Sequence, residues 1–116
     1  MTKQAVTAVA VLSLFPTPGF PHAVLVDAKP AINGSVPGPD IDVELRFNSR
    51  IDAARSRLTL VLPNEKLRPL SLLASATPAT LDAHATGLGS GDYRLRWQVL
   101  AADGHITLGE IPFRVK

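Results

Sequence analysis

The segment YRLRWQV (residues 93–99) alternates apolar and polar side chains without interruption. Neighbouring side chains of a β-strand point to opposite faces, so this pattern predicts a strand with one face in a core and the other in solvent. The segment IDVELRF (residues 41–47) alternates in the same way and predicts a second strand of this kind. Trp97, in the middle of the first segment, is expected at the centre of the core.

Three further segments, residues 23–28, 58–63 and 111–116, also have strand character, and stretches rich in glycine, proline, asparagine and aspartate separate them. Residues 63–66 (PNEK) predict a hairpin turn. Residues 49–58 have room for one helical turn at most. About seven short strands in a chain of this size predict an all-β fold, a single antiparallel β-sandwich.

The amino end of the chain has a different composition. Lys3 precedes eleven apolar-rich residues, 5–15, and the proline-rich segment 16–21 follows them. This run is too short to cross a bilayer core of about 30 Å, which needs roughly 20 apolar residues. It predicts a secretory signal peptide over residues 1–21 and a mature domain over residues 22–116. The alternative is a buried first element of the domain.

The composition excludes several classes of site. The chain has no cysteine, so it can form neither a disulfide nor a thiolate metal site. The predicted leader contains one charged residue, Lys3, so removing it leaves eleven of the twelve Lys and Arg against ten Asp and Glu. This near-neutral balance, without any basic run, predicts that the domain does not bind nucleic acid.

Asp103 and His105 flank Gly104 in the segment LAADGHITLGE (residues 100–110). Residues two apart on an extended chain point the same way, and the glycine lets the backbone bend and approach a bound ion. One carboxylate and one imidazole make half of a four-coordinate nitrogen and oxygen site of the kind that Cu(II) favours. The alternative is that Asp103 only closes a β-turn.

His22 would become the first residue if the leader ended at Pro21. An amino-terminal histidine offers its α-amine and its ring Nδ1 to one metal ion, and reference pKa values of about 8 and 6.5 allow both to bind near neutral pH. With Asp103 and His105, the set is three nitrogens and one oxygen. The alternative is that His22 is only a linker residue.

Four segments resemble the CopC family of secreted copper-binding proteins. They are HAVLVDAKPAINGSV (residues 22–36), VELRFNSRI (residues 43–51), GDYRLRWQVLAADGH (residues 91–105) and GEIPFRVK (residues 109–116). The resemblance runs over nearly the whole mature chain, and residues 91–105 largely match the family's late motif, which ends in D-G-H.

The resemblance implies an immunoglobulin-like, Greek-key sandwich in the periplasm that binds one Cu(II) per chain through His22, Asp103 and His105. It implies a copper carrier or buffer in copper homeostasis and resistance, not an enzyme. We expect a monomer that passes copper to a CopD-like inner-membrane transporter or to another carrier.

The chain also departs from the family. Some members have methionine-rich segments that bind Cu(I), but Met1 is the only methionine here, so we expect no such site. Some members carry a glutamate that can approach the copper in the region where this chain reads Asn48, Ser49 and Arg50, so we expect no extra acidic ligand from this region. Signal peptidase prefers small residues at the last and third-last leader positions, so cleavage after Pro21 is unconventional. Cleavage after Gly19 would leave Phe-Pro before His22.

The remaining ionisable residues have ordinary interpretations. His84 is expected in an exposed loop, outside the metal site. Asp27 and Glu110 are candidates to hold an imidazole N–H near the metal, although a surface role is the simpler interpretation.

Two rival functions remain open. One is a copper-dependent polysaccharide oxygenase, since those enzymes also hold copper through an amino-terminal histidine. The other is a metal-free structural β-sandwich in which the D-G-H turn has no ligand.

Overall fold

The computed structural model describes residues 23–75 and 77–116, which form nine β-strands. The predicted signal peptide and His22 lie outside the described residues. The strands are β1 (Leu25–Lys29), β2 (Gly34–Val36), β3 (Ile41–Phe47), β4 (Ile51–Val61), β5 (Leu67–Leu70), β6 (Leu72–Leu73), β7 (Thr80–Ala85), β8 (Gly91–Ala101) and β9 (Ile106–Val115).

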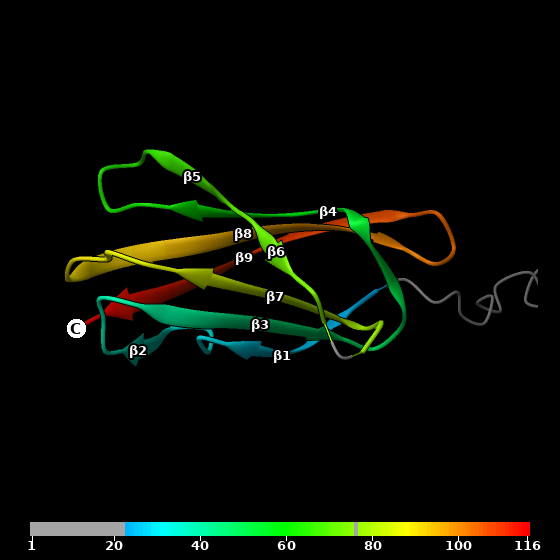
Figure 1. The fold of residues 1–116 in the computed structure, drawn as a ribbon, viewed down its shortest axis with the longest axis horizontal. Helices are drawn as coiled ribbons and strands as arrows, with labels where there is room; N and C mark the ends of the chain where they lie inside the picture. Colours follow the sequence, from blue (N-terminus) through cyan, green and yellow to red (C-terminus); the bar gives the residue numbers. More distant parts are fainter. Residues whose placement is uncertain (1–22, 76) are drawn as a thin grey trace, which may run out of the picture.

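Two sheets pack face to face as a sandwich (Figure 1). One has the strand order β1-β3-β7-β6, and the other has the order β2-β9-β8-β4-β5. The chain passes repeatedly from one sheet to the other, as in immunoglobulin-like sandwiches, and the predicted all-β sandwich is confirmed. All pairings are antiparallel except that of the short strand β2 with β9, which is parallel. Among the described residues, no helix is long and apolar enough to cross a membrane.

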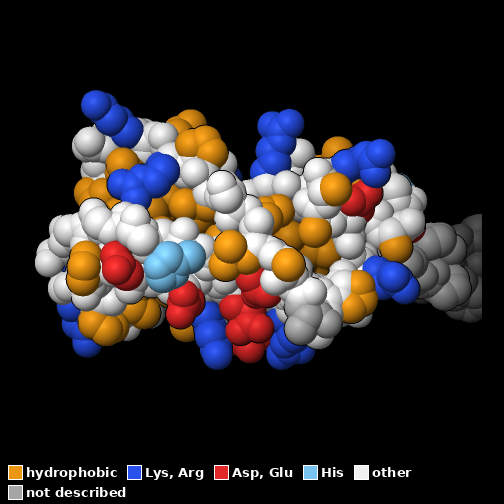
Figure 2. Space-filling view, viewed as in Figure 1, with side chains coloured by type: hydrophobic (Ala, Val, Ile, Leu, Met, Phe, Trp, Pro, Cys, Tyr) orange, Lys and Arg blue, Asp and Glu red, His pale blue; other side chains and the backbone are white. Residues whose placement is uncertain are grey.

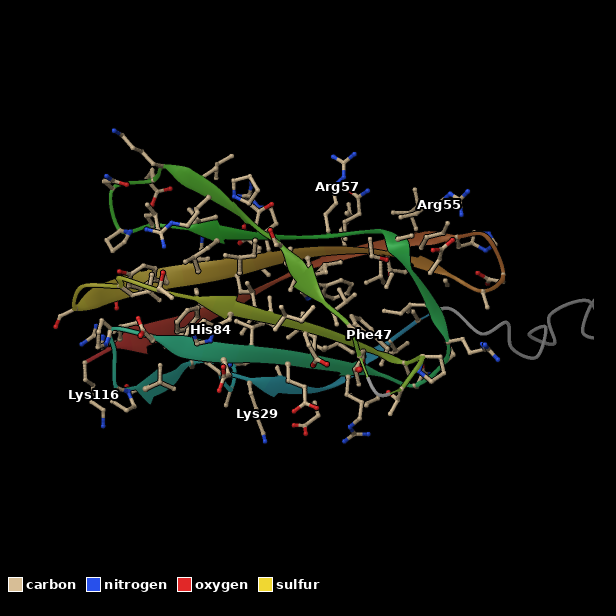
Figure 3. The ribbon with its side chains drawn as sticks, in the orientation of Figure 1. Lys29, Phe47, Arg55, Arg57, His84 and Lys116 are labelled. Atoms are coloured by element: carbon tan, nitrogen blue, oxygen red, sulfur yellow. The ribbon has the colours of Figure 1, made fainter. Side chains whose placement is uncertain are left out.

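The core lies between the sheets and contains the apolar face of each alternating segment. Along β3 and β8 the burial alternates residue by residue, as the sequence pattern predicts. The ring of Trp97 meets the edge of Phe47, with ring centroids 5.2 Å apart and planes at 72°. This contact joins the two sheets, with Phe47 at the end of β3 (Figure 3). The expectation that Trp97 is a core residue is confirmed, since it is 8% exposed.

Tyr93 anchors the start of β8. Its ring stacks on Phe113 with centroids 5.7 Å apart, and its hydroxyl donates a hydrogen bond of 2.8 Å to the carbonyl of Gly89. A tyrosine that bonds back to the backbone a few residues upstream is typical of Greek-key sandwiches. The contact holds the loop before β8 against the end of the core.

Residues 49–58, which have room for one helical turn at most, contain none, because β4 runs through this segment as a strand. The pairing of β4 with β8 shifts register between Asp52 and Arg57, which is a β-bulge. Within the bulge, Ser56 Oγ donates to the carbonyl of Asp52 at 2.7 Å and accepts from the backbone N–H of Leu100 at 3.2 Å. The contact between residues four apart resembles one in a helical turn, but pairing with β8 decides the conformation.

The outer surface carries arginine and lysine side chains as well as scattered apolar ones (Figure 2). Arg55 and Arg57 point away from the sandwich at β4 (Figure 3). Leu67 and Leu73, on the strands that cross from one sheet to the other, are more than half exposed. The expected hairpin turn at residues 63–66 is confirmed, since the N–H of Leu62 donates to the carbonyl of Lys66 at 2.9 Å.

Gly109 stands opposite Trp97 in the β8–β9 ladder, and a Cβ at this position would lie 2.4 Å from Trp97 Cζ2. We predict that Gly109→Ala lowers the free energy of unfolding by about 1–3 kcal/mol, because the indole must move within a packed core. Denaturant unfolding measures this loss. Gly89→Ala is the control, since its Cβ would meet no atom within 4 Å, and it should change stability by less than about 0.5 kcal/mol. Equal stability of the two variants would contradict the prediction.

Candidate metal centre

The turn between β8 and β9 forms one end of the five-stranded sheet. The N–H of Gly104 donates to the carbonyl of Ala101 at 2.9 Å, and the N–H of Ala101 donates to the carbonyl of His105 at 2.8 Å. Gly104 has a φ of 90°, a conformation that residues with a side chain rarely adopt. The glycine thus allows the chain to reverse between Asp103 and His105. The extended chain expected between these two residues is therefore wrong, since both belong to one tight turn.

The carboxylate of Asp103 contacts His105 through both of its oxygens. Oδ1 accepts the backbone N–H of His105 at 3.0 Å, and Oδ2 lies 3.0 Å from the ring Nδ1 of His105. The Asp103 side chain is 15% exposed, whereas that of His105 is 64% exposed. The turn therefore combines a largely buried carboxylate with an imidazole that solvent can reach.

The described chain begins at the same end of the sandwich, beside this turn (Figure 1). Thr107, two residues after His105, donates its hydroxyl to the carbonyl of Ala23 at 3.2 Å. The N–H of Val24 donates to Asn48 Oδ1 at 2.9 Å, and the N–H of Asn48 donates to the carbonyl of Val24 at 2.9 Å. Residues far apart in the sequence thus meet at the β8–β9 end of the domain.

Two of the three predicted metal ligands, Asp103 and His105, are in contact, and the third, His22, lies outside the described residues. Within residues 23–75 and 77–116, no three His, Asp or Glu side chains are grouped in a way that could hold a metal ion. Any site with a third ligand of these types at the turn would need one from the part of the chain that is not described.

His84 and Asp27 lie on the four-stranded sheet, away from the β8–β9 turn. His84 is exposed, as expected, but belongs to strand β7 and not to a loop; its Nδ1 lies 2.8 Å from Asp42 Oδ1 on β3 (Figure 3). Asp27 pairs with Arg46 at 3.6 Å, so its side chain is directed along the outer face of the other sheet. Pairing along β3 explains both positions, which the sequence alone did not define.

Glu110 is held on the outer face of the five-stranded sheet by two arginines. Its carboxylate lies 2.9 Å from Arg96 and 3.7 Å from Arg94. The hydrogen bond from Arg94 to Glu65 and the charge of Glu65 raise the pKa of the Arg94 guanidinium, and Glu110 adds to this effect. A role for Glu110 in holding a metal-bound imidazole is therefore not supported, because its oxygens serve this surface ion-pair network.

Two residues at this end, Asn48 and Thr107, were not predicted from the sequence to have a role in the site. Their partners are 24 and 84 residues away along the chain. A side chain that bonds to the backbone of such a distant residue leaves no local pattern, so only the fold reveals it.

Comparison with known proteins shows the family of the chain. The model of the CopC domain matches residues 25–116. The chain belongs to the CopC family.

Among proteins similar to this CopC-family chain is the copper resistance protein C of Xanthomonas campestris pv. juglandis, which is 31% identical over 90% of the chain and 87% of that protein. The protein YobA of Escherichia coli strain K12 is 28% identical over 94% of the chain and 90% of its own length. The crystal structure of CopC from Methylosinus trichosporium OB3b is 32% identical, with a TM-score of 0.76 over 82% of this chain and 94% of that one.

Substitution of Gly104 tests the backbone geometry of the turn. No atom lies within 4 Å of a Cβ at this position, so the cost of Gly104→Ala comes from the positive φ and not from a clash. We predict a loss of about 1–2 kcal/mol in the free energy of unfolding. Gly104→Asn should lose less, since asparagine tolerates positive φ better than alanine. Denaturant unfolding compares the three proteins, and an alanine variant as stable as the parent would contradict this account of the turn.

Proposed function

We propose that this protein is a periplasmic carrier or buffer that holds one Cu(II) at the β8–β9 turn. The observation that carries the proposal is the contact of Asp103 with His105 next to the point where the described chain begins. The family supports a role in copper resistance, since a relative that matches most of the chain is named a copper resistance protein.

The donors suit Cu(II) better than other ions. We assign two nitrogens to His22, its α-amine and its ring Nδ1, a third nitrogen to His105, and an oxygen to Asp103. Nitrogen and oxygen donors in a tetragonal arrangement are typical of Cu(II).

The position of Ala23 supports the assignment of His22. The carbonyl of Ala23 accepts a hydrogen bond from Thr107, and Ala23 is only 2% exposed. Adjacent Cα atoms are about 3.8 Å apart, so residue 22 is one peptide unit from Ala23, which Thr107 holds at this end of the sandwich. The proposal also requires that the mature protein begins at His22, because only then is the α-amine of His22 free to bind the metal.

Four protein donors favour holding the metal over catalysis, because a reaction needs an open coordination position. The exposed imidazole of His105 leaves the metal within reach of a partner. We propose that copper passes from this site to a CopD-like transporter in the inner membrane or to another carrier.

Removal of the imidazole tests the site directly. We predict that His105→Ala lowers the affinity for Cu(II) at least about 100-fold, since it removes a ring nitrogen donor. Asp103→Asn should lower it less, roughly 10-fold, because an amide oxygen is a neutral and weaker donor. Competition with a Cu(II) chelator of known affinity measures both values.

His84→Ala is the matched control, since His84 contacts Asp42 on the other sheet. It should bind Cu(II) as the parent does. If His105→Ala retains the parent affinity, or if His84→Ala loses it, the proposed site is wrong.

The amino terminus of the secreted protein can be measured independently. We predict that protein exported by its native host has the intact mass of residues 22–116 and gains the mass of one copper ion when one equivalent of Cu(II) is added. The reason is that only a free amine on His22 supplies the second nitrogen of the chelate. Native mass spectrometry measures both, and a start at Phe20 or Val24 would contradict this ligand set.

A further inference from the structure

The segment that follows His22 is attached to the sandwich by one residue on strand β9 and by one residue in the loop after β3. Thr107 Oγ1, on β9, donates to the carbonyl of Ala23 at 3.2 Å. Asn48, just after β3, bonds twice to Val24: its Oδ1 accepts the Val24 N–H, and its own N–H donates to the Val24 carbonyl, both at 2.9 Å. Three hydrogen bonds thus hold two consecutive residues.

The same loop is also joined to the D-G-H turn. The N–H of Ala102, next to Asp103, donates to the carbonyl of Arg50 at 3.3 Å. Arg50 is two residues from Asn48, and Thr107 is two residues from His105. The side chains that hold Ala23 and Val24 therefore belong to the same local framework that positions Asp103 and His105.

We propose that Asn48 and Thr107 form a clamp, defined by these two side chains, that positions the amino-terminal copper ligand. The inference rests on the function proposed above and concerns positioning residues, which themselves do not touch the metal. A chelating terminus that moved freely would lose conformational freedom each time it bound copper. The clamp removes much of that freedom in the metal-free protein, so less is lost on binding.

The clamp has a consequence that does not depend on copper. In the metal-free protein, the Val24 N–H is bonded to Asn48 Oδ1, so its exchange with solvent deuterium requires local opening. We predict that Asn48→Ala speeds exchange of this amide at least about ten-fold, while amides in the centres of β3 and β8 exchange as in the parent. Exchange measured by NMR reads the clamp directly.

The effect on copper is tested with a conservative pair at Thr107. Thr107→Val keeps the shape but removes the hydroxyl, and we predict a loss of about 5- to 10-fold in Cu(II) affinity. Thr107→Ser keeps the hydroxyl and should restore most of the affinity. Thr59→Val, a half-buried threonine on β4 of the same sheet, is the control and should bind as the parent does. All proteins are tested in the secreted form that begins at His22.

The Cu(II) electron paramagnetic resonance spectrum separates positioning from general loss of stability. In Thr107→Val and Asn48→Ala, we expect a second species with fewer nitrogen donors near neutral pH, because the terminus is released more often. A variant that is only less stable would show the parent spectrum at lower occupancy.

The outcomes distinguish the two proposals. If the parent protein beginning at His22 does not bind Cu(II), or if His105→Ala binds it equally well, the proposed function is wrong and the copper role of the clamp falls with it. If His105→Ala loses copper while Thr107→Val and Asn48→Ala keep the parent affinity and spectrum, only the clamp is overturned. Faster Val24 exchange together with weaker binding that Thr107→Ser restores supports it.

Discussion

The antiparallel pairing of β8 with β9 is the constraint on which the other features depend. Its register runs from Gly91 opposite Val115 to Leu100 opposite Ile106. A slip of one residue would turn every side chain of one strand to the opposite face. The register therefore places Trp97 in the core, aligns it with a glycine that leaves room for the indole, and closes the ladder in the turn that contains Asp103 and His105.

The centre of the sandwich and its β8–β9 end differ in composition. The centre of the sandwich is apolar and tightly packed, with the edge-to-face contact of Phe47 and Trp97 joining the sheets. The ion pairs on the outer faces, such as Arg96 with Glu110, are exposed and contribute little to stability. Burial of the core thus supplies the rigidity, and the β8–β9 end can carry the polar groups of the proposed copper site.

The turn combines two properties that a carrier of a metal ion needs. A largely buried carboxylate, bonded to the backbone and ring of its neighbour, has few orientations available to it. In the proposed function, the exposed imidazole of His105 would leave the bound ion accessible to a partner. The hydrogen bonds of Asn48 and Thr107 extend this arrangement to the start of the described chain, so the rigid sheets determine the position of the two residues before β1.

The sequence by itself determined the fold class and the strands around Trp97 and residues 41–47, because alternation is a local property. It placed Asp103 and His105 on either side of one glycine, but it predicted an extended chain where the structure has a tight turn. It did not determine the bulge in β4. There, a hydrogen bond between residues four apart, Ser56 and Asp52, lies within a strand and not in a helical turn. The place of His84 on a strand and the ion pairs of Asp27 and Glu110 also required the structure. Only the tertiary structure brought Asn48 and Thr107 to Val24 and Ala23, because hydrogen bonds between residues 24 and 84 apart depend on the packing of whole sheets.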